Sequence, residues 1–172
     1  FDAVEVIDAE TLISPNLPRP FAARRDLGAR AVQADYAVRN PDAGWRTRLI
    51  AIAFGAFHIV RSRARERLSL SCGLRGNGMC FSTELLREIP HNAYSVVEDV
   101  EYGVRLGEAG HRVHYADEAH VYGEMVTTSA AANTQRRRWE EGRKALIQQH
   151  ARRLLGAGLR RPSRVLFDLA LD

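Results

Sequence analysis

Two carboxylates follow the first strand-like segment of the chain. Residues 1–7 are mainly apolar and alternate as an extended strand does, and Asp8 and Glu10 come directly after them. Side chains two residues apart in an extended chain point the same way, so both carboxylates could meet one hard cation. Acidic turns and helix caps use the same residue types. The pair therefore predicts either a divalent-cation site or an ordinary polar turn.

A second acidic pair, Glu98 and Asp99, lies at the start of a predicted helix. Residues 95–98 have the form of a capping box, and the helix ends before Gly110. Acidic side chains in a first turn complement the helix dipole. The same dipole keeps a carboxylate ionised, as a general base requires. Asp99 is therefore either a dipole-complementing acid or a general base.

Two glycines flank an asparagine just before a short apolar strand. Gly76, Asn77 and Gly78 allow the backbone to approach a ligand closely. A hairpin turn centred on Asn-Gly would use the same residues. Both interpretations stay open from the sequence.

A glutamine, an arginine and a tryptophan recur at helical spacing near the end of the chain. Gln135, Arg138 and Trp139 would share one face of a helix, which we predict over residues 129–155. An arginine fork suits phosphate oxygens, and an indole ring can carry a sugar or a base. A basic, solvated surface helix is the plainer interpretation.

The intervening segments alternate between strands and helices. We predict strands at 1–7, 31–39, 112–115 and 119–123, and helices at 14–28, 45–63, 84–89 and 95–109. The longest apolar run, residues 49–60, has His58 as its one strongly polar member, and we predict a buried or interfacial helix there. This order of elements indicates an α/β sandwich with a mainly parallel sheet.

Composition narrows the class of protein. The chain has 172 residues, which suits one domain with a core, and a net charge of +4 carried almost wholly by arginine. Cys72 and Cys80 form no metal-binding pair, and no histidine pair has zinc spacing. Residues 142–165 contain no acid, so the tail is a candidate for a basic segment at an anionic membrane surface; a solvated basic helix is the alternative.

The four motifs, in this order, resemble the family 2 glycosyltransferases, and among them the membrane-associated branch that includes cellulose and related polysaccharide synthases. The likeness covers residues 1–155. It implies the GT-A fold, the nucleotide-diphospho-sugar transferase sandwich, of which this chain would hold the C-terminal part. We expect an inactive fragment, with residues 156–172 as a basic tail that leads to a transmembrane segment.

The resemblance also implies roles for single residues. Asp8 and Glu10 would hold Mg²⁺ or Mn²⁺ against the diphosphate, and Asp99 would be the catalytic base. The substrate-binding positions would be Gly76, Asn77, Gly78, Glu98, Gln135, Arg138 and Trp139. The chain departs from the family at Glu10, where a second Asp is usual, and at Val97, where Thr is usual.

The function implied is an inverting transfer of a hexosyl or N-acetylhexosaminyl group in cell-surface polysaccharide or glycan synthesis. The donor would be a UDP- or GDP-sugar and the acceptor a saccharide or a lipid-linked sugar. We expect a membrane-associated enzyme, held through its flanking segments, with its catalytic domain on the cytoplasmic side of a bacterial inner membrane. Two alternatives remain: a non-catalytic scaffold derived from a transferase, and a basic module that binds nucleic acid through residues 136–164. For the favoured prediction, a glycosyltransferase, we expect no nucleic-acid partner.

Overall fold

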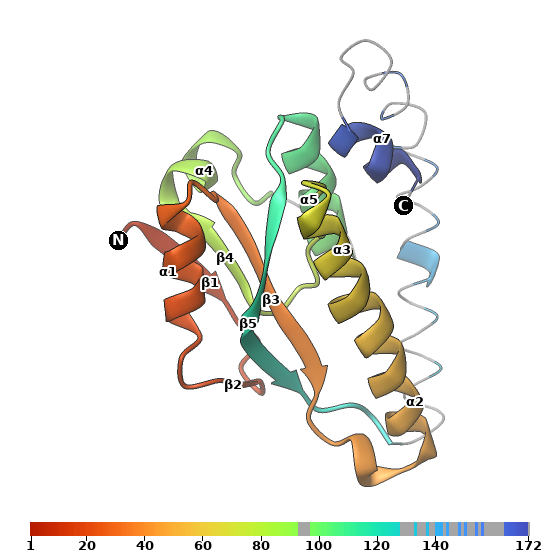
Figure 1. Ribbon diagram of the computed structural model, residues 1–172. Helices are drawn as coiled ribbons and strands as arrows, with labels where there is room; N and C mark the ends of the chain where they lie inside the picture. The colour runs from red at the N-terminus through yellow and green to blue at the C-terminus, as the bar shows by residue number, and fades with distance from the viewer. Residues whose placement is uncertain are drawn as a thin grey trace.

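The protein is built around one mixed β-sheet. The computed structural model describes residues 1–92, 97–127 and 164–171, together with scattered positions between 133 and 156. Within that part of the chain the sheet has five strands in the order β1-β4-β3-β5-β2. Figure 1 shows β3 and β5 crossing the centre of the molecule. The bounds are Ala3–Val6 (β1), Leu12–Ile13 (β2), Ala31–Val38 (β3), Met79–Ser82 (β4) and Val113–Gly123 (β5).

The α/β class is confirmed, but the expectation of a mainly parallel sheet needs correction. Only β3 and β5 pair in parallel among the described strands, whereas β1–β4, β4–β3 and β5–β2 are antiparallel. The cause is β4, which leaves the glycine turn at 76–78 and inserts between β1 and β3. Those two strands still run in the same direction, so their carboxyl ends lie at one edge of the sheet.

β5 is one strand where we predicted two. Ala34 pairs with Ala116 and Asp35 with His120, so residues 117–119 form an irregularity within a continuous parallel ladder. A bulge of this kind bends a strand without ending its pairing. The polar residues Asp117 and Glu118 occupy this bulge.

Two helices cover opposite faces of the sheet, because successive residues of a strand point to opposite sides. Val32 of β3 packs with Leu17 and Phe21, which belong to α1 (Pro18–Asp26) and its approach. Ala31 packs in a second cluster with Tyr102 of α5 (Glu98–Glu108). The short helix α4 (Thr83–Glu88) completes this second layer. Strands and helices thus enclose two apolar cores.

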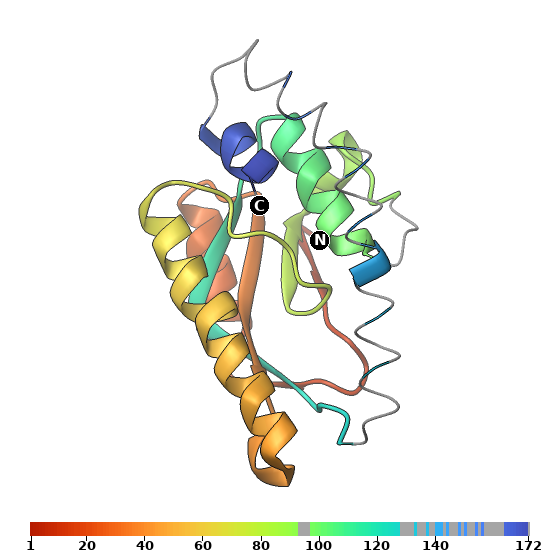
Figure 2. The ribbon, with the colours of Figure 1, turned by 90° about the vertical axis from the view of Figure 1, so that its right-hand side faces the viewer.

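Residues 45–67 form one long helix, four residues longer than predicted. It consists of α2 (Trp45–Phe54), a π-helical turn η2 (Gly55–Val60) and α3 (Arg61–Arg67), and the 3-10 turn η1 (Pro41–Ala43) precedes it. Figure 2 shows this helix running along the sheet, with α5 to its right in that view. Within the described residues, no helix combines the length and the apolarity needed to cross a bilayer.

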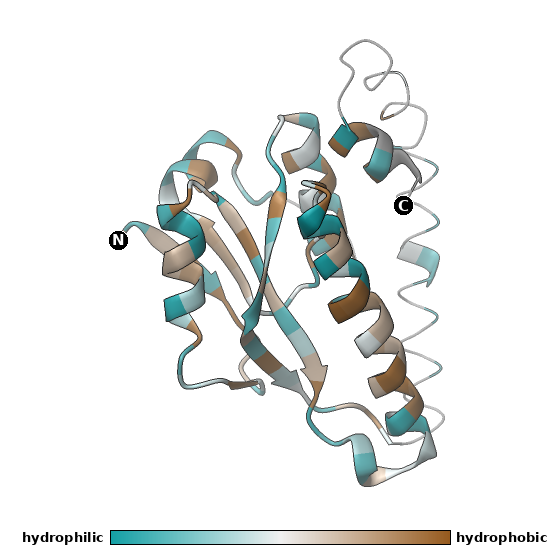
Figure 3. Cartoon of the chain, in the orientation of Figure 1, coloured by the Kyte–Doolittle hydropathy of each residue, from teal (hydrophilic) through white to brown (hydrophobic). Residues whose placement is uncertain are grey.

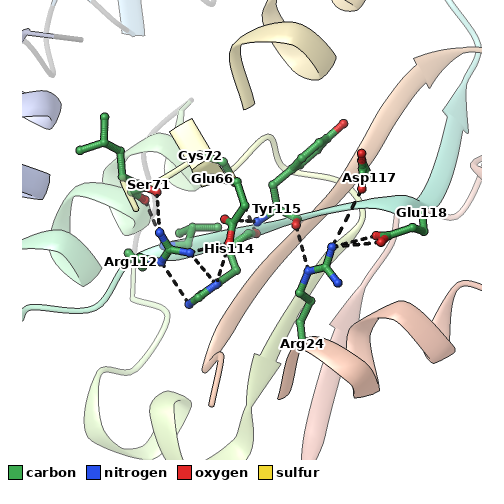
Figure 4. A network of polar contacts seen from close by, with 11 residues as sticks. Arg24, Glu66, Ser71, Cys72, Arg112, His114, Tyr115, Asp117 and Glu118 are labelled. Carbon is green, nitrogen blue, oxygen red and sulfur yellow. Dashed lines mark hydrogen bonds and ion pairs between the residues drawn. The ribbon is translucent and has the colours of Figure 1, made fainter. Parts of the chain in front are cut away.

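Polar side chains fasten β5 to the helices on either side of it (Figure 4). Glu66 of α3 accepts hydrogen bonds from Arg112, at 2.5 Å, and from the amide of Tyr115, at 3.0 Å, and His114 Nδ1 lies 3.2 Å from the same carboxylate. On the other side, Arg24 of α1 donates to the Tyr115 carbonyl and to Glu118. The bulged strand is therefore held at both of its flanks.

The last described element is α7 (Arg164–Leu171), which packs on α5 through Leu166 and Leu169 beside Val104. Asp168 forms an ion pair with the buried Arg65 of α3. The placement of the tail at a membrane surface stays a prediction.

Candidate functional site

The turn after β1 and the glycine turn before β4 are joined by one side chain. Asn77 is buried, and its Oδ1 accepts a hydrogen bond from the backbone amide of Asp8 at 3.3 Å. Its Nδ2 donates to Thr11 Oγ1 at 2.6 Å. The backbone adds a third link, since the Gly78 amide donates to the Val6 carbonyl. Asn77 therefore sets the conformation of the segment that carries Asp8 and Glu10.

The glycine turn itself is held from below by Gln33 of β3. The Gln33 Nε2 donates to the carbonyls of Asn77, at 2.8 Å, and Gly78, at 3.3 Å, while its Oε1 accepts from the Arg75 amide. Gln33 is fully buried, and these bonds satisfy the amide that burial would otherwise leave unpaired. Gln33, a polar residue of β3, thus holds the glycine turn in place through side-chain hydrogen bonds.

Gly76 and Gly78 are required for different reasons. Both have positive φ, 75° and 69°, where a side chain is strained. A Cβ on Gly78 would meet the Val121 side chain at 2.7 Å. A Cβ on Gly76 would lie 3.6 Å from Asp99 Oδ2, so the bare backbone at this glycine faces the Asp99 carboxylate.

The N-terminus of α5 brings the second acidic pair to the same place. Asp99 lies beside Gly76, as the glycine geometry shows, and Glu98 is close enough to raise the pKa of Asp8. Both carboxylates belong to the first turn of α5. The capping-box residue Ser95 lies outside the described residues, and the observed N-cap, Val97, makes no side-chain cap bond.

Negative charge accumulates at this end of the sheet. The pKa of the exposed Asp8 is raised, first by partial burial of its carboxyl and then by the charges of Glu10 and Glu98. Like charges resist joint ionisation, and a cation or a proton relieves them. The site is therefore an acidic cluster that favours positive charge near Asp8.

Tyr36 belongs to this neighbourhood, although its place in an alternating strand identified it only as an apolar residue. The pKa of Tyr36 is raised by burial, lowered in part by a hydrogen bond with Asn77, and raised further by Asp8 and Glu10. Its ring also stacks on His58 of the long helix, with centroids 5.8 Å apart. The residue thus connects that helix to the acidic cluster, a link that no local sequence signal reveals.

The donor set at Asp8 fits a cation that brings its own ligands. No group of three or more His, Cys, Asp or Glu residues within the described part of the chain could hold a metal ion by itself. Asp8 and Glu10 are two exposed carboxylates, and Mg²⁺ is commonly bound by one or two carboxylates completed by water and substrate phosphates. The two acids could therefore form part of a coordination shell.

The structure thus gathers six of the predicted positions into one region: Asp8, Glu10, Gly76, Asn77, Glu98 and Asp99. Gly78 closes the turn against Val121 and Ala34 instead of facing the acids. The remaining three predicted residues, Gln135, Arg138 and Trp139, lie outside the described residues.

A comparison with protein families gives an independent result. The model described as "Glycosyltransferase like family 2" matches residues 1–142, most of the chain, including both acidic pairs and the glycine turn. The comparison with individual curated proteins gave no match.

Proposed function

The chain belongs to glycosyltransferase-like family 2, and from this premise we propose that it forms the acceptor-side part of an inverting, nucleotide-sugar-dependent transferase site. The observation that carries the proposal is that Asp8 and Asp99 lie beside adjacent residues of one turn, Asp8 at Asn77 and Asp99 at Gly76. Two carboxylates on separate elements allow one to serve the diphosphate side and the other the acceptor.

In the proposed reaction the acceptor hydroxyl oxygen forms a bond to the anomeric carbon of the donor. The bond from that carbon to the diphosphate oxygen breaks, and the nucleoside diphosphate leaves with the electron pair. Asp99 takes the hydroxyl proton as general base. Its position at the N-terminus of α5 favours the ionised form that this role requires.

Asp8 and Glu10 would hold a divalent cation, Mg²⁺ or Mn²⁺, which when bound supplies positive charge to the leaving diphosphate. The cluster of Asp8, Glu10 and Glu98 supports this assignment, because ionised carboxylates repel one another without a counter-charge. Asn77 orients Asp8 through the backbone amide. Glu10 in place of aspartate lengthens the side chain by one methylene.

Further proposals follow the resemblance. The enzyme would be of the polysaccharide-synthase-like branch, take a UDP- or GDP-sugar, and act on a saccharide or lipid-linked acceptor at the cytoplasmic side of a membrane. Gln135, Arg138 and Trp139 would bind the diphosphate and the acceptor. The repulsion among the carboxylates of the acidic cluster supports the diphosphate side of this proposal, because a bound cation would relieve it.

The test is the turnover of a nucleotide-sugar by the full-length protein carrying Asp99→Asn. We expect kcat to fall by about 10²–10⁴-fold, the usual contribution of a general base, with little change in donor binding. Glu101→Gln is the matched control, because Glu101 lies in the same first turn and complements the same dipole. Loss of activity in both variants to the same extent would reduce Asp99 to a dipole-complementing acid.

Metal dependence separates the enzyme from the scaffold. Activity in the wild-type protein should disappear in chelator and return with Mn²⁺ or Mg²⁺, and Asp8→Ala should remove both activity and this dependence. Activity that persists unchanged in chelator would refute the cation site. Absence of nucleotide-sugar hydrolysis and transfer by the intact protein, with any donor, would favour the scaffold.

A further inference from the structure

The long helix at residues 45–67 buries three of its polar residues and exposes a row of large apolar ones. Thr47, Ser62 and Arg65 are buried, whereas Leu49 and Ile52 are 55% and 65% exposed. A surface helix normally does the opposite and packs its apolar stripe on the core. Figure 3 shows apolar positions recurring along this helix. The reversal leaves a large apolar surface in water.

The buried polar groups explain why the helix cannot simply rotate. Thr47 Oγ1 donates to two backbone carbonyls that precede the helix, and Ser62 Oγ accepts from Arg75 at 2.5 Å. Arg65 pairs with Asp168, and His58 Nδ1 lies 3.0 Å from the Tyr36 carbonyl. Turning the apolar side inward would leave these partners unpaired in the interior. The outward side is therefore fixed by the fold.

The exposed apolar side forms a continuous stripe. Trp45, Leu49 and Ile52 lie at successive turns of α2, and Phe57 and Val60 continue the stripe through η2, each of the five being 55–68% exposed. The helix of 23 residues is about 34 Å long at the usual rise of 1.5 Å per residue. Patches of this extent on soluble domains indicate an interaction surface.

Charge at the two ends of the helix indicates what covers the stripe. Arg46 stacks over the Trp45 ring at 5.0 Å, and Arg67 ends the helix at its other end. Neither has an acidic partner among the described residues. Residues 45–65 contain no acid at all, and the first one, Glu66, is bound to Arg112 and His114. Aromatic and aliphatic residues with flanking arginines are typical of helices that lie in a membrane interface.

We propose that the helix at residues 45–67 lies in the surface of an anionic lipid bilayer, with Trp45, Ile52 and Val60 in the acyl boundary. The convex, rod-like shape of a lone helix suits a planar surface. Arg46 and Arg67 would contact lipid phosphates. His58, on the inward side, stacks on Tyr36 beside the acidic cluster, so this contact would also orient that cluster relative to the lipid. The surface is separate from residues 156–172 and does not depend on the proposed reaction.

The experiment places an environment-sensitive nitrobenzoxadiazole label at single positions of the full-length chain. The native Cys72 and Cys80 are buried, with thiol pKa values raised by burial to about 12 and about 11, so a new surface cysteine is labelled selectively. Ile52→Cys reports on the stripe. Leu27→Cys, at an 82% exposed position after α1, is the matched control.

With vesicles of phosphatidylcholine containing about one-third phosphatidylglycerol, we expect the label at position 52 to shift to the blue and to be quenched by nitroxide lipids. The label at position 27 should respond to neither. Arg46→Gln with Arg67→Gln should weaken binding by about 25-fold on anionic vesicles, at about fivefold per arginine, and much less on pure phosphatidylcholine. A label at Phe57→Cys should also be quenched by nitroxide lipids. Adding Ile52→Glu to that labelled protein should reduce the quenching at least about tenfold.

Three results would overturn the proposal. The label at position 52 could stay water-like on both vesicle types. The labels at 52 and 27 could respond equally, which would indicate nonspecific adsorption. A blue shift at position 52 that grows with protein concentration in the absence of lipid would assign the stripe to contact between copies of the chain. Circular dichroism of each variant separates these results from unfolding, and Ile52→Leu should retain binding.

Discussion

Asn77 accepts a hydrogen bond from the backbone amide of Asp8 across 69 residues of sequence. The contact sets the acidic turn against the glycine turn, and the register of β1 with β4 places the two together, since Val6 pairs with Met79. The acidic cluster therefore depends on a neutral, buried amide as much as on its carboxylates.

Replacing Asn77 with alanine should separate this role from simple stability. The variant loses the bonds to Asp8 and Thr11, which should lower the free energy of unfolding by about 1–3 kcal/mol. Asn77 would position Asp8, the residue proposed to bind the cation. Cation affinity and turnover should therefore fall about 10–100-fold in the full-length protein. Asn40→Ala is the control, since Asn40 also makes two bonds, both to Met125. Equal losses of turnover in the two variants would contradict the positioning role.

Gly78→Ala should destabilise the fold more than Gly110→Ala. Both glycines have positive φ, so each substitution strains the backbone by about 1 kcal/mol or more. Only at Gly78 does the new methyl group also meet Val121 and Ala34, whereas nothing lies within 4 Å at Gly110. We expect an added loss of about 1–3 kcal/mol from overpacking at Gly78. Urea denaturation of both variants measures the difference, and equal midpoints would refute it.

Glu10→Gln should lower the pKa of Asp8. Partial burial would still raise that pKa, but one of the two charges that raise it further would be gone. A carboxyl whose pKa is raised by folding contributes stability that is fully present below its unfolded pKa, near 3.9, and is lost as pH rises through the higher folded pKa. Glu10→Gln should therefore lessen the loss of folding stability that Asp8 causes above about pH 4. Carbon-detected NMR titration of Asp8 measures the pKa directly; an unchanged value would show that Glu10 is too distant to share a cation.

Glu66→Gln should make stability less dependent on acid pH. Burial raises the pKa of Glu66, but its bonds with His114 and Tyr115 and the charge of Arg112 outweigh burial and lower it overall. The stabilisation is present above the unfolded pKa, near 4.3, and is lost as pH falls through the lower folded value. Thermal unfolding between about pH 6 and pH 3 should show a shallower decline in the variant.

Glu88→Gln provides the comparison for that experiment. Glu88 is exposed, and hydrogen bonds from Arg30 and His111 lower its pKa. Solvent screening weakens an exposed pair, so the acid decline should change little. If the thermal stability of Glu66→Gln falls with acid pH as steeply as that of the wild type, the hydrogen bonds and ion pairs of Glu66 add no stability.

Local signals in the sequence were enough to predict most elements and the candidate acids. Alternation predicted β3, the long apolar run predicted a helix at 45–63, and Gly110 marked the end of α5, because these patterns depend on neighbours within a few residues. The order of four motifs, ending with the one at residues 135–139, also indicated a family 2 transferase, and the family is confirmed by the match over residues 1–142.

Only the tertiary structure decided which of these segments meet. The insertion of β4 between β1 and β3 made the sheet mixed, and strand pairing of this kind depends on contacts far apart in sequence. The same holds for Gln33 beneath the glycine turn and Tyr36 beside the acids. The sequence predicted a helix at 45–63 with a buried or interfacial apolar run, but the partners available to Ser62 and Arg65 determined that these polar residues are buried.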